Sequence, residues 1–215
     1  MDRIALELLK HFPSLIWFAF AIIALLVFRK PVGDLLTKIG GVKAMGVELS
    51  FLEGFIDEVN VELAKKYAQS AVRVSATDKR RVLNRVKKHL DILENADILW
   101  VDDNPENNIN ERRMFRQLKV EIEIARSSEE ALKILSNGRY DLVFSDMDRD
   151  GESDAGIKFL KQFREIDNTT PVVFYIDKLD PAKGTPAGAF GITNRPDELL
   201  HLTLDALERR KYEKA

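Results

Sequence analysis

The sequence of 215 residues contains no cysteine and only three histidines, His11, His89 and His201. The lack of cysteine excludes disulfide bonds, a thiol nucleophile and any zinc or iron–sulfur site that needs thiolate ligands. Because the histidines lie far apart in the sequence, we do not expect a metal site built from several imidazoles. Glycine and proline number only 11 and 7, which excludes collagen-like and low-complexity chains. The 45% of hydrophobic and 32% of charged residues are typical of a globular protein.

An excess of charge of one sign is also lacking. The formal net charge is -2, so the chain has no overall attraction to nucleic acid. Residues 79–88 are a local exception, because six of them are basic: Lys79, Arg80, Arg81, Arg85, Lys87 and Lys88. We interpret this segment first as a solvated helix face and second as a contact with anionic lipid. Nucleic acid comes third, because no aromatic side chains are interleaved to stack on bases.

One long hydrophobic run is present near the N-terminus. Residues 12–28 are 17 consecutive residues without a charge, and Arg29 and Lys30 follow them. A bilayer is crossed by about 20 mostly apolar residues, so we expect residues 1–30 to form a transmembrane anchor. More Lys and Arg residues follow the run than precede it, which predicts that the C-terminal part lies in the cytoplasm. The alternatives are a buried core helix and a cleaved signal peptide, although no small-residue cleavage site follows the run.

Residues 31–95 are expected to form a membrane-proximal region with a helical linker. The alternating pattern of residues 42–49 predicts a short strand, and apolar residues every four positions from Phe55 to Tyr67 predict a helix. A second helix is expected to begin after a cap at Ser75 or Thr77. Its apolar positions form a seam that is too short for a firm coiled-coil assignment, namely Leu83, Val86, Leu90 and Leu93. The seam predicts either packing within the subunit or a weak homodimer.

Residues 97–211 alternate between short apolar runs and helical patterns. Strands are expected at 98–101, 121–125, 142–144, 172–176 and 191–193, and helices at 105–118, after Ser127, at 155–166 and at 196–210. Ser127 with Glu130 is a capping-box pattern. This alternation predicts an α/β fold with a parallel sheet that is covered by helices on both faces. The site of such a sheet lies beyond the carboxyl ends of its strands.

Acidic residues stand at the predicted strand ends. Asp102 and Asp103 follow the first strand, and Asp146 and Asp148 follow the third. Converging carboxylates repel one another unless a cation lies among them, and oxygen-only ligands favour Mg²⁺, Mn²⁺ or Ca²⁺. The alternative is that these acids only solvate loops and favour the helix N-termini that follow. An EF-hand reading of residues 146–157 is disfavoured, because Ile157 stands where the loop needs its bidentate glutamate.

The segment from Asp97 to about Arg210 resembles the receiver domain of bacterial response regulators. The resemblance rests on ILWVDDN at 98–104, YDLVFSDM at 140–147, PVVF at 171–174 and GAFGITNRP at 188–196, and it covers slightly over half of the chain. It implies a flavodoxin-like, five-stranded parallel sheet in two-component signalling. It also implies that Asp146 accepts a phosphoryl group from a histidine kinase. Mg²⁺ or Mn²⁺ would be held by Asp102, Asp103, Asp146 and the backbone carbonyl of Asp148.

The sequence departs from the receiver pattern at three places. Ile176 stands where receivers carry a Thr or Ser hydroxyl, and Arg195 stands where they carry a Lys before a Pro. Residues 177–187, which should hold the fourth helix, contain Pro181, Gly184 and Pro186. Arg195 is nevertheless expected to be the cation that faces the phosphoryl group.

Two functions therefore remain open. The first is a single-pass protein of the bacterial inner membrane whose cytoplasmic receiver-like domain is phosphorylated in signalling. The second is a pseudo-receiver effector or scaffold that binds a partner or small ligand without phosphotransfer. We expect no enzyme activity beyond the phosphoacceptor chemistry. A phosphatase of the haloacid-dehalogenase type is disfavoured, because its paired acids follow the first strand rather than a later one.

Overall fold

The computed structural model describes residues 54, 56–58 and 74–213. The predicted transmembrane anchor at 1–30, the short strand at 42–49 and most of the helix between Phe55 and Tyr67 lie outside these residues. Gly54 and residues 56–58 are helical. Within the part that the structure describes, no helix has both the length and the apolar character needed to cross a membrane.

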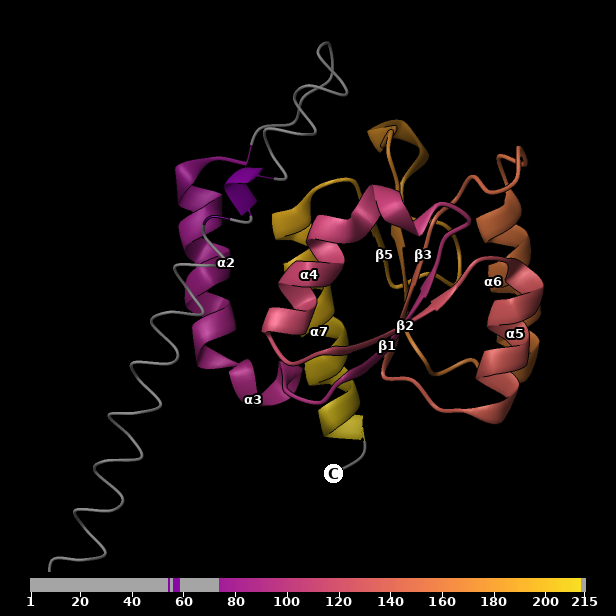
Figure 1. The fold of residues 1–215 in the computed structure, drawn as a ribbon, viewed down its shortest axis with the longest axis horizontal. Coiled ribbons are helices and arrows are strands. Elements are labelled where there is room, and N and C mark those ends of the chain that lie inside the picture. Colours follow the sequence, from indigo (N-terminus) through magenta and orange to yellow (C-terminus); the bar gives the residue numbers. More distant parts are fainter. Residues whose placement is uncertain (1–53, 55, 59–73, 214–215) are drawn as a thin grey trace, which may run out of the picture. The chain divides into compact units, whose positions relative to one another are not determined.

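A five-stranded parallel sheet forms the centre of the fold (Figure 1). The strands follow the order β2-β1-β3-β4-β5, and each is hydrogen-bonded in parallel to its neighbour. Their bounds are β1 Asp97–Val101, β2 Glu121–Ala125, β3 Leu142–Ser145, β4 Val172–Tyr175 and β5 Gly191–Thr193. The predicted flavodoxin-like sheet and its strand positions are therefore confirmed.

Helices cover both faces of the sheet (Figure 1). α2, α3, α4 and α7 contribute to the hydrophobic cluster on one face, and α5 and α6 contribute to the cluster on the other. Their bounds are α2 Ala76–Lys88, α3 Leu90–Leu93, α4 Ile109–Gln117, α5 Ser128–Asn137, α6 Ala155–Ile166 and α7 Pro196–Glu213. The 3₁₀ turn η1, Pro105–Asn108, precedes α4, so the α-helix expected from residue 105 begins four residues later.

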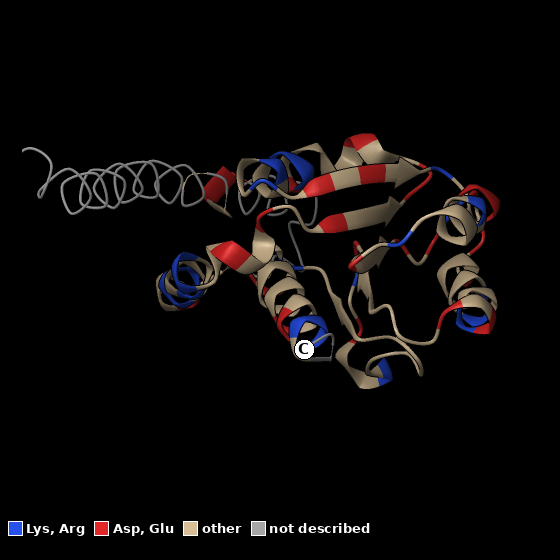
Figure 2. Ribbon diagram, turned by 90° about the horizontal axis from the view of Figure 1, so that it is seen from below, with Lys and Arg blue, Asp and Glu red and all other residues tan. Residues whose placement is uncertain are grey.

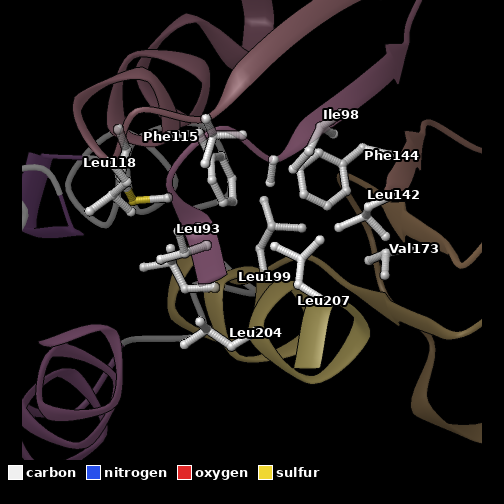
Figure 3. Close-up of a cluster of buried hydrophobic side chains, with 14 of the residues drawn as sticks. Leu93, Ile98, Phe115, Leu118, Leu142, Phe144, Val173, Leu199, Leu204 and Leu207 are labelled. Carbon is white, nitrogen blue, oxygen red and sulfur yellow. The ribbon is translucent and has the colours of Figure 1, made fainter. Parts of the chain in front are cut away.

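The inner strands β1, β3 and β4 are mostly apolar because both of their faces are buried, whereas the edge strand β2 exposes Glu121 and Glu123. Along β1, Ile98 and Trp100 face the cluster under α4 and α7, whereas Leu99 and Val101 face the cluster under α5 and α6. Figure 3 shows the first cluster, where side chains of the sheet meet Leu93, Leu118 and the leucines of α7. The Trp100 ring packs edge-to-face on Phe144, with 4.9 Å between the ring centroids. Successive residues of one strand thus supply two separate cores.

α2 and α3 lie within the residues expected to form the linker, and they pack on α7. Val82, Val86 and Leu93 are fully buried in the same cluster as the strand residues. The Arg85 guanidinium pairs with Asp205 Oδ1 at 2.5 Å and with Glu208 Oε2 at 3.1 Å, both on α7. The seam therefore packs within the subunit, which is one of its two predicted uses.

The observed helices differ from the predicted ones in two details, a break between α2 and α3 and the geometry of the cap of α5. The helix with the seam is broken, because α2 ends at Lys88 and α3 begins at Leu90. Ser75 caps α2 by accepting from the Asp78 N–H, and Ser127 caps α5 by accepting from the Glu130 N–H, both at 3.1 Å. The Glu130 carboxylate accepts in return from the Arg126 N–H at 2.7 Å. The capping box thus closes one residue earlier than the usual pattern.

The connection between β4 and β5 contains no α-helix. Its regular structure is the 3₁₀ turn η2, Pro181–Lys183, which Asp180 caps by accepting from the Ala182 N–H at 3.0 Å. Gly184 follows with φ +64°, a left-handed conformation that glycine adopts without strain. The prediction that residues 177–187 are too interrupted for a regular helix is confirmed.

Candidate functional site

Three carboxylates meet at the carboxyl edge of the sheet. Asp102 and Asp103 directly follow β1, and Asp146 directly follows the neighbouring strand β3. One oxygen from each of the three lies within 4.8 Å of the others. This edge is where the strand order reverses, since the chain leaves β1 for β2 on one side and β3 lies on the other. The structure therefore brings together the acids that the sequence places at strand ends.

Asp102 is the most buried of the three, at 2% exposure. Its carboxylate accepts from the Asn104 N–H at 2.8 Å and from the Asn108 side-chain amide. Burial raises the pKa of Asp102, the two hydrogen bonds oppose that rise, and the neighbouring Asp103 charge adds to it. η1 thus positions Asp102 through Asn108, a contact that sequence spacing did not reveal.

Asp103 is held from the other side of the site by the loop after β3. Its Oδ2 accepts from the Asp150 N–H at 2.9 Å. Asp150 and Gly151 both have positive φ, +53° and +81°, and form a tight turn closed by hydrogen bonds between Arg149 and Glu152. The turn therefore directs a backbone donor at one of the clustered carboxylates.

Asp146 has the most perturbed acid–base equilibrium of the cluster. Burial raises its pKa to about 6, and the charges of Asp102 and Asp177 contribute in the same direction. The Met147 N–H donates to Asp146 Oδ1 at 2.6 Å and partly opposes the shift. A carboxylate with this pKa remains mostly ionised at neutral pH and is a better nucleophile than an ordinary one.

The donor set fits a hard divalent cation. Each of the three acids contributes a carboxylate oxygen, and among the described residues no His or Cys belongs to the group. Burial and neighbouring negative charge both disfavour the ionised forms of Asp102 and Asp146 when no cation is bound. The arrangement is thus suited to Mg²⁺ or Mn²⁺.

A cavity of about 750 Å³ opens beside the acids. Asp148, the fourth residue predicted for the metal site, is exposed and lines it. Ile176 and Ile192 form part of its apolar wall, and Lys178 and Lys183 of the β4–β5 connection also line it. The β4–β5 connection, which contains η2, therefore forms one wall of the cavity.

Arg195 lies outside the acidic cavity. Its guanidinium pairs with both carboxylate oxygens of Asp197, with Nε–Oδ1 at 3.0 Å and Nη2–Oδ2 at 2.5 Å. A third contact joins it to Asp78 of α2 at 3.5 Å. Arg195 is not among the residues that line the acidic cavity. The structure therefore does not bring it to the carboxylates that it was expected to serve.

Arg149 is a buried cation beside the site that its acidic neighbours in the sequence did not indicate. Its guanidinium donates to Ser145 Oγ at 2.8 Å, to Ser128 Oγ at 2.9 Å and to the backbone carbonyl of Asp146. It also lies 5.6 Å from the centre of the Phe159 ring. Burial lowers the pKa of Arg149, and the charge of Asp146 is the largest opposing influence. Arg149 joins β3, α5 and α6 directly behind Asp146.

Gly156 allows α6 to approach the acidic loop. Its N–H donates to the Met147 carbonyl at 2.9 Å. A Cβ at this position would lie 2.7 Å from the Asp146 carbonyl oxygen and 2.8 Å from the Phe174 ring. Neither neighbour can move easily, since one is backbone and the other is fully buried. Only glycine leaves room for this contact.

The chain is similar to known proteins of one family. Residues 98–200 match the family model of the response regulator receiver domain. Similar solved structures include the chemotaxis response regulator CheY4 of Vibrio cholerae, which is 25% identical over 54% of this chain and 98% of its own, with a TM-score of 0.43. The response regulator TrrA of Thermotoga maritima, in complex with Mg(2+)-BeF, is 24% identical over 52% of this chain and 98% of its own, with a TM-score of 0.45.

No curated protein matches the chain. The family match spans all five strands except Asp97, the first residue of β1, and includes the three clustered acids. Residues 98–200 are therefore a response regulator receiver domain.

Proposed function

We propose that the protein is a membrane-anchored signalling protein whose Asp146 accepts a phosphoryl group from a histidine kinase. Asp102, Asp103, Asp146 and the backbone carbonyl of Asp148 would hold Mg²⁺ or Mn²⁺. The single observation that carries the proposal is the convergence of three carboxylates within 4.8 Å at the edge of a receiver sheet.

The chemistry follows from the state of Asp146. One of its carboxylate oxygens attacks the phosphorus of a phosphohistidine, the new O–P bond forms, and the P–N bond breaks as the imidazole leaves. A bound divalent cation supplies positive charge that neutralises the transferring oxygens. Burial and neighbouring charges keep Asp146 basic, and the Met147 N–H orients its Oδ1.

A protein cation is also needed beside the phosphoryl group. Lys178 and Lys183 line the cavity, whereas Arg195 is paired with Asp197 and Asp78. We therefore assign this role to a lysine of the β4–β5 connection in preference to Arg195. Lysine acts as a compact charge and does not require the planar fit of a guanidinium.

The anchor is proposed from the sequence alone. The charge-free residues 12–28 with Arg29 and Lys30 after them support one N-terminal helix in a bacterial inner membrane, with the receiver domain in the cytoplasm. We expect the full chain to sediment with membranes and to resist carbonate extraction, and we expect removal of residues 1–30 to release it. Recovery of the full chain in the carbonate supernatant would contradict the anchor.

A second candidate function is binding without phosphotransfer. Ile176 offers no hydroxyl to a phosphoryl oxygen, and an oxygen left without a donor costs about 1–3 kcal/mol. The structural response in ordinary receivers depends on that hydroxyl, so a pseudo-receiver that binds a partner through the acidic cavity is the alternative.

Labelling with a small phosphoryl donor distinguishes the phosphorylated receiver from the pseudo-receiver. The full chain is incubated with an acyl phosphate and Mg²⁺, and its intact mass is measured. We expect a gain of one phosphoryl group that Asp146→Asn abolishes and that Asp177→Asn, a second acid of the same cavity, retains. No gain under conditions that label an ordinary receiver would favour the pseudo-receiver.

A further inference from the structure

The outer face of α2 carries positive charge that the rest of the domain does not neutralise. Seven residues of this helix are exposed, and among them are four cations and no acid: Ala76, Thr77, Arg80, Arg81, Asn84, Lys87 and Lys88. The spacing from Arg80 to Lys88 places them on one side of the helix. We call Arg80, Arg81, Lys87 and Lys88 the basic face. Figure 2, in which Lys and Arg positions are blue, shows much of the α2 ribbon in blue at the margin of the domain.

The other cations of α2 have a structural use. Arg85 pairs with Asp205 and Glu208 of α7, and Lys79 Nζ lies 2.5 Å from Asp57 Oδ2. In the basic face, Arg81 has one contact, at 3.7 Å from Asp78. Over residues 74–213 no carboxylate pairs with the remaining three cations. α5, α6 and α7, in contrast, each expose acids as well as cations.

We propose that the basic face binds the anionic headgroups of a lipid bilayer. Four cations along about 12 Å of helix form a flat array, which matches a surface of many phosphates better than it matches one small anion. Each Lys or Arg near such a surface strengthens binding by roughly fivefold at physiological salt. Residues 76–95 contain no Phe, Trp or Tyr, so the face lacks the stacking groups that bind single-stranded nucleic acid.

The position of α2 in the chain supports this partner. Asp57 contacts Lys79, and Ile56 is fully buried in the same cluster as Val82, so the chain enters the domain beside α2. Only 23 residues separate Lys30 from Gly54 in the sequence. A segment of this length spans at most about 80 Å, so a bilayer anchor before Arg29 keeps α2 within reach of the headgroups at a high effective concentration. The choice of lipid as partner thus rests on the proposed anchor.

The test uses the lack of cysteine in the chain. Asn84 lies in the middle of the basic face, and Gln162 is an exposed amide on α6 that serves as the matched control. Each is replaced by cysteine in the full chain and labelled with a fluorophore, and the protein is reconstituted into nanodiscs that contain a headgroup quencher. We expect several-fold stronger quenching of the Asn84→Cys label in phosphatidylglycerol than in phosphatidylcholine, and loss of the difference in about 0.5 M salt.

Charge variants assign the effect to the basic face. Changing its four residues to Gln should abolish the lipid-dependent quenching, whereas Gln at four exposed cations elsewhere should not: Arg116, Lys133, Arg139 and Lys161. Equal melting temperatures of the two variants show that both are folded. Equal quenching in the two lipids, or quenching that survives in the first variant, overturns the proposal. Protection of the label by RNA and not by lipid also overturns it.

A separate measurement distinguishes failure of the proposed anchor from failure of the proposed lipid contact. Carbonate extraction of the same preparation reports membrane insertion without using the label. If the chain is extracted, the same quenching is measured with added vesicles of the two lipids. Salt-sensitive quenching by the anionic vesicles alone would then support the basic face without the anchor, and its absence would overturn both.

Discussion

Replacing Asp146 with Asn should stabilise the metal-free protein at neutral pH. The pKa of Asp146 rises from an ordinary 3.8 to about 6 in the folded chain, so its ionised form is disfavoured by folding. Two pKa units correspond to an upper limit of about 3 kcal/mol, and partial solvent access reduces the expected gain to about 2 kcal/mol. Asn keeps an oxygen that can accept the hydrogen bond from Met147 N, so the loop geometry is preserved.

The sign of the pH dependence follows from proton binding. Between about pH 4 and pH 6 the native state binds more protons at Asp146 than the unfolded state does, so wild-type stability falls as pH rises through this window. The Asn variant lacks this loss. The gain in stability of the Asn variant over the wild type should therefore be small at about pH 4 and complete above about pH 7.

Thermal unfolding in a chelator measures the effect. About 2 kcal/mol corresponds to a rise in Tm of roughly 4–8 °C for a domain of this size. The control is Glu165→Gln, which removes an exposed acid on α6 and should leave Tm nearly unchanged. A Tm gain as large at pH 4 as at pH 7.5 would refute the electrostatic reasoning, as would no gain at either pH.

Three further predictions concern the metal, the core and the buried cation. Millimolar Mg²⁺ should raise the Tm of the wild type, and Asp103→Asn should remove most of that response; an unchanged wild-type Tm would show that no cation binds. Leu93→Ala should lower the free energy of unfolding by about 2–5 kcal/mol without changing the molecular mass in solution, since Leu93 is fully buried within the subunit. Arg149→Met should destabilise by about 1–3 kcal/mol in chemical denaturation because three acceptors lose a donor, whereas Met at the exposed Arg139 should have little effect.

The strands and clustered acids were predictable because they depend on local patterns. A strand buried on both faces, such as β3 or β4, is a short apolar run, whereas the edge strand β2 alternates Glu and Ile. All five strands lie within one residue of their expected bounds. The carboxyl ends of neighbouring parallel strands share an edge, so Asp102 and Asp146 had to converge once the sheet was assigned. The break in the β4–β5 connection followed from its Pro and Gly residues.

The environments of the arginines were not predictable, because they depend in part on residues far away in the sequence. Besides its near neighbour Asp197, Arg195 is paired with Asp78, which lies on a helix that precedes the sheet. Arg149 reaches Ser128 at the start of α5, and its neighbours in the sequence, Asp148 and Asp150, are exposed. A run of alternating acids around one arginine looks like a solvated loop, and nothing in it shows that the central cation turns inward.

The packing of α2 and α3 shows that the folded domain of this protein begins before the segment that matches the family. The family match begins at residue 98, but Val82, Val86 and Leu93 belong to the core that this match encloses. A fragment cut at the family boundary would expose the apolar side of α7 to water and should be prone to aggregation. Gene fusions and domain exchanges that follow the family boundary would thus separate a helix pair from the core to which it belongs, whereas a junction before Gly54 keeps the helix pair and the buried Ile56 with that core.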